Sequence, residues 1–480
     1  MAVNEAQLAF AAWQAEEEKA RQRAVVTARR YHDGLQDTFM TERMRQFLNV
    51  NDQYEFNLNI CRLVVDVIAE RLIVLGPTTN EKAASTGSAT GAAPVRAWAE
   101  ALWHDVSGDI LQESIHEGTP RDGEYFVIVD WDAQAGQGRM VPHGRFTDAT
   151  VGGDNYGCKA HYPDENTDLP MQYASKRWVE DLGSGKTRSR LNLYYPDRVE
   201  KYEVLGGGQL RPFQDEADAA WPLPWLNGQG LPLGIPVIHF ANTPDLRPEA
   251  WDAIPPQKAI NKTLIDTVAT ADSTAFQVLV ALGWIPTTDG QPLKSDGSNA
   301  ATIAPGIILG TSKSKNDADL KALPAGDVRP LIELMISLIG WVAVVSSTPA
   351  ARLSFTRQVA AEGTLKEQNE GLFAKVRKRQ KRIGAGWVRC FEMARKLANT
   401  FGNAGLDEAV ALDVVWEPVQ SRDTQDERDE WRVKRELGVP TEQLWSEMGY
   451  SLAEIERMRQ SPEYQARLAM MQVGLDDSAG

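Results

Sequence analysis

The sequence predicts an α+β protein that is mainly helical, and three features support this fold class. A long charged segment, Thr356 to Asn403, lacks proline and repeats apolar residues near helical spacing. An apolar segment, residues 328–347, precedes it and breaks at Thr348-Pro349. Between residues 124 and 240, β-branched and aromatic runs alternate with Gly, Pro and Asp turns, which predicts a sheet.

The composition predicts a soluble protein with more than one domain. The chain has 480 residues, of which 42% are hydrophobic, enough to bury two or more cores. Its first segment alternates apolar and charged residues and lacks a signal-peptide core, so we expect an amphipathic helix in a cytoplasmic protein. The three cysteines lie far apart without a CxxC pair and are expected to be buried thiols. The net charge of −15 argues against a tight, sequence-reading nucleic-acid binder.

The N-terminal half is expected to begin with helices and to continue as a sheet. Residues 5–75 have helical patterning, and the helix within residues 57–76 is expected to end at Gly76-Pro77. Residues 78–94 are rich in Thr, Ser, Gly and Ala and predict a flexible loop. Residues 98–118 predict one further amphipathic helix.

The C-terminal half alternates long helices with short strands. Trp251 to about Phe276 predicts a helix with Pro255-Pro256 in its opening turn. Short apolar strands are expected between this helix and residue 328. After the long charged helix, a short strand and two or three helices follow, one of them with a Ser451/Glu454 capping box.

The apolar helix at 328–347 needs a partner surface. Leu331 to Val345 contains only Glu333 as a charge, but this run is shorter than the roughly 20 residues that span a bilayer. Gly340 and three valines are poor helix formers, so the segment depends on neighbours for its conformation. Neighbouring copies of the same helix would supply them.

The sequence GSGKT at 183–187 resembles the end of a phosphate-binding loop. The full motif requires a glycine at position 180, which is Glu180 here. The segment joins two strand-like runs, whereas a phosphate-binding loop leads from a strand into a helix. We therefore predict a hairpin turn, and a nucleotidase that uses Lys186 stays open as the enzyme alternative.

No other motif points to catalysis or to a cofactor. A nucleophile elbow, a His-Glu-x-x-His sequence and a tight carboxylate pair are missing from the sequence, and the six histidines are scattered. His239 lies within an apolar strand and is expected to be a satisfied core residue rather than a ligand.

The long helix carries a dense group of cations. They are Lys375, Arg377, Lys378, Arg379, Lys381 and Arg382. One interpretation is a surface that is solvated or paired with acids. The other is a belt that faces phosphates or a neighbouring subunit, because such a density of charge repels itself unless carboxylates or a polyanion compensate it.

Several segments together resemble the portal, or head-to-tail connector, proteins of tailed double-stranded-DNA phages, in particular the siphophage type. In chain order they are YHDGLQ (31–36), NLNICRLVVDVIAERLIVLG (57–76), GIPVIHFANTP (234–244), PPQKAINKTLIDTVATAD (255–272), EGTLKEQNE (362–370), and VVWEP with LGVPTEQLWSEMGYSLAEI (414–455). Their order and spacing cover nearly the whole chain.

This resemblance implies a ring, usually of twelve subunits, around a central DNA channel. The implied parts are a wing (1–250), a stem helix (251–276), a clip (277–327), a second stem helix (328–347), a tunnel loop (348–355), a long wing helix (356–403) and a crown (404–480). Twelve copies at −15 each would carry about −180, and an acidic bore would keep DNA from sticking as it moves.

The resemblance also implies sites and partners. DNA would be contacted by the tunnel-loop residues Ala350, Ala351, Arg352, Leu353 and Phe355. The clip, with Trp284, Lys294, Lys313 and Lys315, would dock partner proteins. These partners are the terminase large subunit and head-completion or adaptor proteins, and the ring would also meet the major capsid and scaffolding proteins.

The expected place of the protein is the capsid portal vertex of the virion, after assembly in the host bacterial cytoplasm, with no membrane partner, cofactor or enzymatic activity. A minor capsid or scaffold protein without a DNA channel remains the structural alternative.

Overall fold

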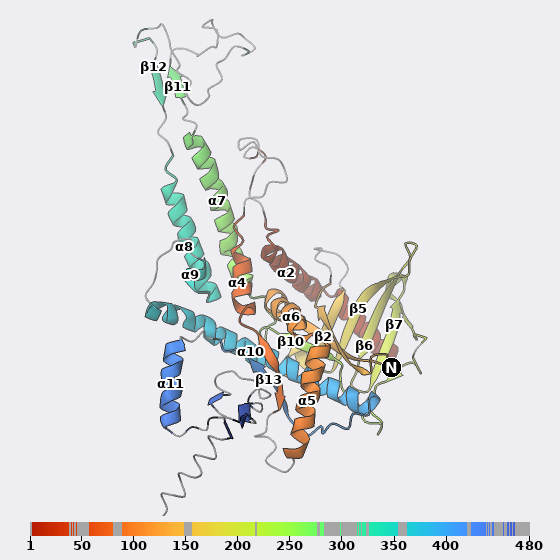
Figure 1. Cartoon of the computed structure of the whole chain (residues 1–480). Helices are drawn as coiled ribbons and strands as arrows, with labels where there is room; N and C mark the ends of the chain where they lie inside the picture. The colour runs from red at the N-terminus through yellow and green to blue at the C-terminus, as the bar shows by residue number, and fades with distance from the viewer. Residues whose placement is uncertain are drawn as a thin grey trace, which may run out of the picture. The chain divides into compact units, whose positions relative to one another are not determined.

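We describe a computed structural model of the chain, which divides into two compact units. The first unit comprises residues 1–30, 64–251 and 360–480, and the second comprises residues 31–63 and 252–359 (Figure 1). The structure describes residues 2–37, 57–79, 89–147, 156–216, 218–275, 279–282, 319–322, 326–353, 362–419 and 424–437, with isolated positions at 40–45, 298, 314–317 and 439–465.

The helices of the first unit come from both ends of the chain. They are α1 (Ala2–Gln14), α2 (Glu16–His32), α5 (Ala89–Asp105), α6 (Gly108–Asp122), α10 (Glu362–Phe401) and α11 (Thr424–Glu436), and the short turns are η2 (Pro163–Glu165), η3 (Gly206–Gly208) and η4 (Trp251–Ala253). α2, α4 (Ile60–Ala69) and η4 run across a boundary between the units.

Three antiparallel sheets lie within the described residues of the first unit. Strands β10 (Val237–Ala241), β2 (Glu124–Asp132) and β3 (Gln137–Gly144) form one sheet in the order β10-β2-β3. A six-stranded sheet contains β4 (Gly157–His161), β5 (Tyr173–Asp181), β6 (Thr187–Tyr194), β7 (Arg198–Val204), β8 (Leu210–Pro212) and β9 (Leu223–Pro224). The third is the pair β1 (Val74–Thr79) and β13 (Leu412–Trp416).

Strand β2 lies between two apolar cores because its side chains alternate in direction. Val127 and Val129 belong to a core that they share with Trp387 of α10 and Ile115 of α6. Phe126, the residue before Val127, points to the other face and belongs to a separate core formed with residues of β4, β5 and β10. The strand is thus buried on both faces, which explains its nearly uninterrupted apolar sequence.

The long helix α10 passes so close to two strands that only glycine fits at one contact. A Cβ at Gly386 would lie 2.6 Å from the Phe240 ring, and one at Gly384 would lie 3.2 Å from the Trp416 indole nitrogen. These glycines are poor helix formers. They allow α10 to cross β10 and β13 (Figure 1).

The predicted α+β class is confirmed, as are the sheet strands between residues 124 and 240 and the short strand after the long helix. The helix predicted within residues 57–76 ends earlier, at Ala69. Gly76 and Pro77 do not stop a helix but lie in β1 beside a register shift. A strand with only one partner tolerates proline, which lacks an N–H group.

Two further boundaries differ from prediction. The expected loop at 78–94 gives way to α5 from Ala89, because the alanines that surround its Gly and Pro favour a helix. The single helix expected at 98–118 is two helices, broken where Ser107 takes a left-handed conformation with φ 52°. The predicted capping box at Ser451 lies outside the described residues.

The second unit is built on a helix pair. α7 (Ile254–Ala275) packs along α8 (Arg329–Ser346), and the short helix α9 (Ala350–Leu353) follows α8 (Figure 1). Strands β11 (Leu279–Leu282) and β12 (Asp319–Ala322) form an antiparallel ribbon. These elements confirm the two predicted helices, and β11 and β12 match the short strands expected before residue 328.

Candidate functional site

Helix α8 has an apolar face that the single chain leaves largely uncovered. Its exposed side chains are Ile332 (38%), Leu334 (45%), Ile336 (54%), Trp341 (61%), Val344 (78%) and Val345 (51%). The other side of the helix, with Leu338, Ile339 and Val342, is buried. By length and composition α8 is long and apolar enough to cross a membrane. Only 28% of it is buried in the chain, so it is not an ordinary core helix. An apolar surface of this kind requires a covering partner.

The end of α8 leads sharply into the predicted tunnel loop. Ser347 adopts φ 52°, and the backbone N–H of Thr348 donates to the Ala343 carbonyl, which ends the helix. The Ser346 hydroxyl donates to Thr348 Oγ1 at 2.8 Å. This cap fixes the direction in which the chain leaves the helix.

The predicted tunnel-loop residues begin with one helical turn, α9, rather than an open loop. Ala350, Ala351 and Arg352 are exposed and Leu353 is buried. Phe355 lies outside the described residues.

A buried network of side-chain amides fastens residues 57–60 to α7. Gln257 accepts from the backbone N–H of Ile60 at 3.0 Å and donates to the carbonyl of Leu58 at 2.6 Å. Asn261 donates to the Gln36 side chain at 2.6 Å. Gln257 and Asn261 are 0% and 1% exposed. Because each amide has specific partners inside the unit, the network fixes the position of residues 57–60 on α7.

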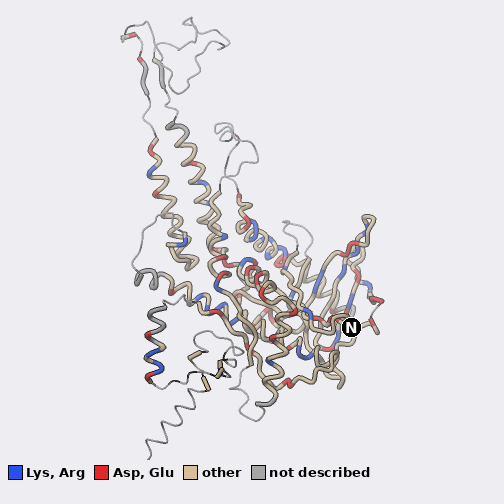
Figure 2. Tube along the Cα trace, viewed as in Figure 1, with Lys and Arg blue, Asp and Glu red and all other residues tan. Residues whose placement is uncertain are grey.

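Two of the six predicted belt cations face inward. Lys375 and Arg379 both form ion pairs with Glu249, whose side chain is 6% exposed, and the Arg379 pair measures 3.0 Å. Burial would raise the pKa of Glu249, but Lys375, Arg379 and the Asn242 amide hold it below its usual range. Arg377, Lys378 and Lys381 are exposed and Arg382 is half-buried. Lys and Arg positions are blue in Figure 2, which has the same view as Figure 1, where α10 is labelled.

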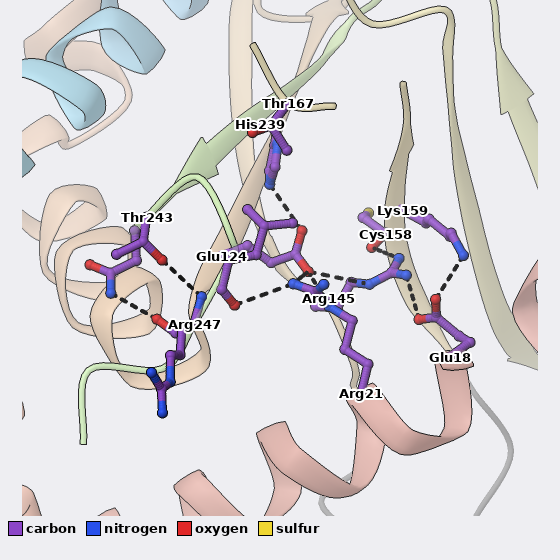
Figure 3. Close-up of polar contacts among 12 residues, drawn as sticks. Glu18, Arg21, Glu124, Arg145, Cys158, Lys159, Thr167, His239, Thr243 and Arg247 are labelled. Carbon is purple, nitrogen blue, oxygen red and sulfur yellow. Dashed lines mark hydrogen bonds and ion pairs between the residues drawn. The ribbon is translucent and has the colours of Figure 1, made fainter. Parts of the chain in front are cut away.

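A second charged cluster lies against α2, around Glu124 at the start of β2 (Figure 3). Glu124 is paired with Arg21 at 2.8 Å, with Arg145 at 3.4 Å and with His239 Nε2 at 2.9 Å. Burial would raise the pKa of Glu124, but these partners outweigh it and hold the pKa well below the ordinary value. Glu18 bridges Arg145 and Lys159 beside it.

These side chains line a cavity of about 560 Å³. Every charge named above already has an opposite charge in contact, so the arrangement joins α2 to two sheets. His239 is 3% exposed and is also hydrogen-bonded to the Tyr162 hydroxyl at 2.9 Å. His239 is thus a buried core residue, as predicted, with Nδ1 hydrogen-bonded to Tyr162 and Nε2 beside the Glu124 carboxylate.

Sequence reasoning missed how the charges in both clusters pair. Glu124 and Glu249 each stand beside apolar strand or turn residues, and their partners Arg21 and Arg379 lie 103 and 130 residues away along the chain. The sequence offered one signal, a charged residue next to a buried strand. This signal does not identify the residue that forms the ion pair.

The GSGKT segment is the turn of the hairpin between β5 and β6. Asp181 pairs with Thr187, and Gly183, Ser184 and Gly185 all have positive φ in the turn between them. The hairpin prediction is confirmed, and no helix follows to cradle a phosphate.

The remaining predicted positions are the cysteines and the clip residues. The three cysteines are buried, as predicted, and burial raises the pKa of Cys61 to about 12. No cluster of three or more His, Cys, Asp or Glu suited to a metal is present in the part of the chain that the structure describes. The clip residues Trp284, Lys294, Lys313 and Lys315 lie outside that part.

A family model described as "Phage portal protein, SPP1 Gp6-like" matches residues 166–467. This match covers more than half of the 480 residues, so the chain belongs to the phage portal protein family. Proteins of this family are structural components of the virion at the head-tail connection and serve in DNA packaging. No curated protein matches the chain.

Proposed function

We propose that the chain assembles into a closed ring, with twelve copies, that forms the channel for DNA packaging and ejection at one capsid vertex. The uncovered apolar face of α8 carries this proposal. In a ring, α8 of each copy lies against the next copy, which removes that face from water. Membership of the portal family supports this partner over a lipid bilayer.

In this assembly the parts take the roles that the resemblance implies. Residues 251–276 and 328–347 are the stem helices, residues 277–327 the clip and residues 348–355 the tunnel loop. Residues 1–250 and 356–403 form the wing, and residues 404–480 the crown. The observed packing of α7 along α8 supports a paired-helix stem.

The clip, including Trp284, Lys294, Lys313 and Lys315, docks the terminase large subunit during packaging and head-completion or adaptor proteins afterwards. The major capsid and scaffolding proteins meet the ring at the vertex, and assembly takes place in the host bacterial cytoplasm. Double-stranded DNA passes without sequence recognition, because a subunit charge of −15 opposes tight binding.

Electron microscopy of the purified protein, together with its mass in solution, tests the ring. We expect closed rings with a central hole wide enough for a DNA duplex. A monomer or dimer at all concentrations would favour the minor capsid or scaffold alternative.

The tunnel-loop role has a separate test in the phage. Replacing the exposed Ala350, Ala351 and Arg352 with glycine, and leaving the buried Leu353 in place, should impair DNA packaging or retention and leave the ring intact. Normal packaging by this variant would remove the loop from the proposal.

A further inference from the structure

The exposed side of α10 lacks a partner in the described part of the chain. Glu249 holds Lys375 and Arg379 on the buried side. The remaining cations, Arg377, Lys378 and Lys381, point to solvent, and none of them is paired with a carboxylate among the described residues. These three residues are called the basic face below.

The basic face also offers room for a neighbouring side chain. Ala374 and Ala385 are exposed and lie on the same side of α10 as Lys378 and Lys381, at helical spacings of three and four. Small residues on either side of the cations allow another surface to approach the helix closely. The face therefore combines three positive charges with a shallow apolar surface.

A complementary surface lies where α5 meets α6. Asp105, Asp109 and Glu113 are exposed there, and within the described ranges no ion pair involves any of them. The Asp109 carboxylate accepts a hydrogen bond from the Trp103 indole at 3.2 Å, which holds it in place. Ile110 stands beside these acids with its side chain 70% exposed. The three acids and Ile110 are called the acidic face.

We propose that the basic face of one copy docks on the acidic face of the next copy in the ring. A ring built by rotation joins two different surfaces of the same chain, so a complementary pair on one subunit is what such an assembly requires. Three cations meet three carboxylates, and Ile110 packs over the alanines of α10. This inference rests on the proposed ring and adds a second contact, in the first unit, to the one made by α8.

DNA is the alternative partner for the basic face, because DNA is a polyanion. The charge balance favours a second copy instead. The chain as a whole carries −15, so DNA is repelled at long range, whereas the acidic face brings matched charge and an exposed isoleucine together. Because both faces are exposed, salt screens their attraction, and assembly should weaken as ionic strength rises.

The test is a charge-reversal cycle on the full-length protein. One variant carries Arg377→Glu, Lys378→Glu and Lys381→Glu, a second carries Asp105→Lys, Asp109→Lys and Glu113→Lys, and a third combines all six. Ring formation is followed by mass in solution and by electron microscopy across a salt series. Lys186→Glu, at the exposed hairpin turn, is the control for a change of charge alone.

Each triple variant should need at least about tenfold more protein for half-maximal ring formation at low salt, because like charges then face each other. The combined variant should recover most of the loss, and the control should assemble as the wild type does. Thermal melts of the basic-face variant at low concentration should match the wild type, since its three side chains are exposed in the single chain. The acidic-face and combined variants should melt slightly lower, because Asp109→Lys removes the acceptor of the Trp103 indole and a favourable charge in the first turn of α6.

Three outcomes would overturn the inference. In the first, the triple variants form rings as readily as the wild type. In the second, both triple variants weaken the ring and the combined variant does not recover it. In the third, the basic-face variant assembles normally and loses only DNA retention, which assigns the face to DNA. A wild type that forms no ring would instead refute the proposed function.

Discussion

Substituting Val344 with serine tests whether α8 is covered by a neighbouring copy. The side chain is 78% exposed in the single chain, so the folded subunit barely depends on it. Val342, two positions earlier on the same helix, is 0% exposed and provides the matched control. Serine and valine have similar helix propensities, so the comparison isolates burial rather than helix formation.

The size of the expected effect follows from the exposed fraction. Full burial of a valine side chain is worth about 1.5–3 kcal/mol, so covering the exposed 78% contributes about 1–2 kcal/mol to each interface. Val344→Ser should therefore weaken each contact by about tenfold, since 1.4 kcal/mol is a factor of ten. Val342→Ser loses buried apolar contact and buries a hydroxyl, which should cost the subunit itself about 2–4 kcal/mol.

Two assays separate these effects. Sedimentation or mass measurement over a concentration series reports ring formation, and a urea titration of the unassembled chain reports subunit stability. We expect Val344→Ser to raise the concentration needed for ring formation without changing the urea midpoint. Val342→Ser should lower the urea midpoint of the unassembled chain. Normal ring formation by Val344→Ser would refute the reasoning, because it would mean that no neighbour covers this face.

Three further changes test the fold and the excluded chemistry. Gly386→Ala places a Cβ 2.6 Å from the Phe240 ring, so it should lower the free energy of unfolding by about 2 kcal/mol. Gly340→Ala places its Cβ where nothing lies within 4 Å, so it should raise the free energy of unfolding by about 0.5–1 kcal/mol. Thermal melts measure both changes. Burial lowers the pKa of His116 from 6.5 to about 4, so on acidification the unfolded chain gains the proton first, and stability should fall by about 2 kcal/mol between pH 6.5 and pH 5. Urea midpoints measured at both pH values should show this loss in the wild type and a smaller one in His116→Gln. Lys186→Ala should change nothing in a calorimetric titration with ATP, and ATP binding that this substitution abolishes would contradict the hairpin interpretation.

Local signals predicted most of the fold. Periodicity placed α7, α8 and α10, and the turn residues around GSGKT correctly indicated a hairpin. The errors came where tertiary packing overrides local preference. Gly76 and Pro77 are typical helix terminators, yet they lie in β1 because β13, more than three hundred residues later, supplies the pairing.

The functional surfaces were less accessible to sequence reasoning. The sequence did predict that the apolar helix at 328–347 packs against neighbouring copies, because its composition alone indicates a helix that must be buried. The cation run on α10 was read as a single group, whereas Glu249 divides it into buried and exposed members. That division depends on a carboxylate far away in the sequence, so no pattern within the helix reveals it.

The two proposed contacts differ in their physical character, and this difference suits a ring that must assemble in one register. The apolar face of α8 supplies non-directional stabilisation that hardly depends on salt. The charged faces of α10 and α5–α6 add little energy per pair at an exposed surface, but a shifted register would bring like charges together, which costs several kcal/mol. We therefore infer that α8 supplies most of the binding energy, while the charged faces select the alignment of neighbouring copies.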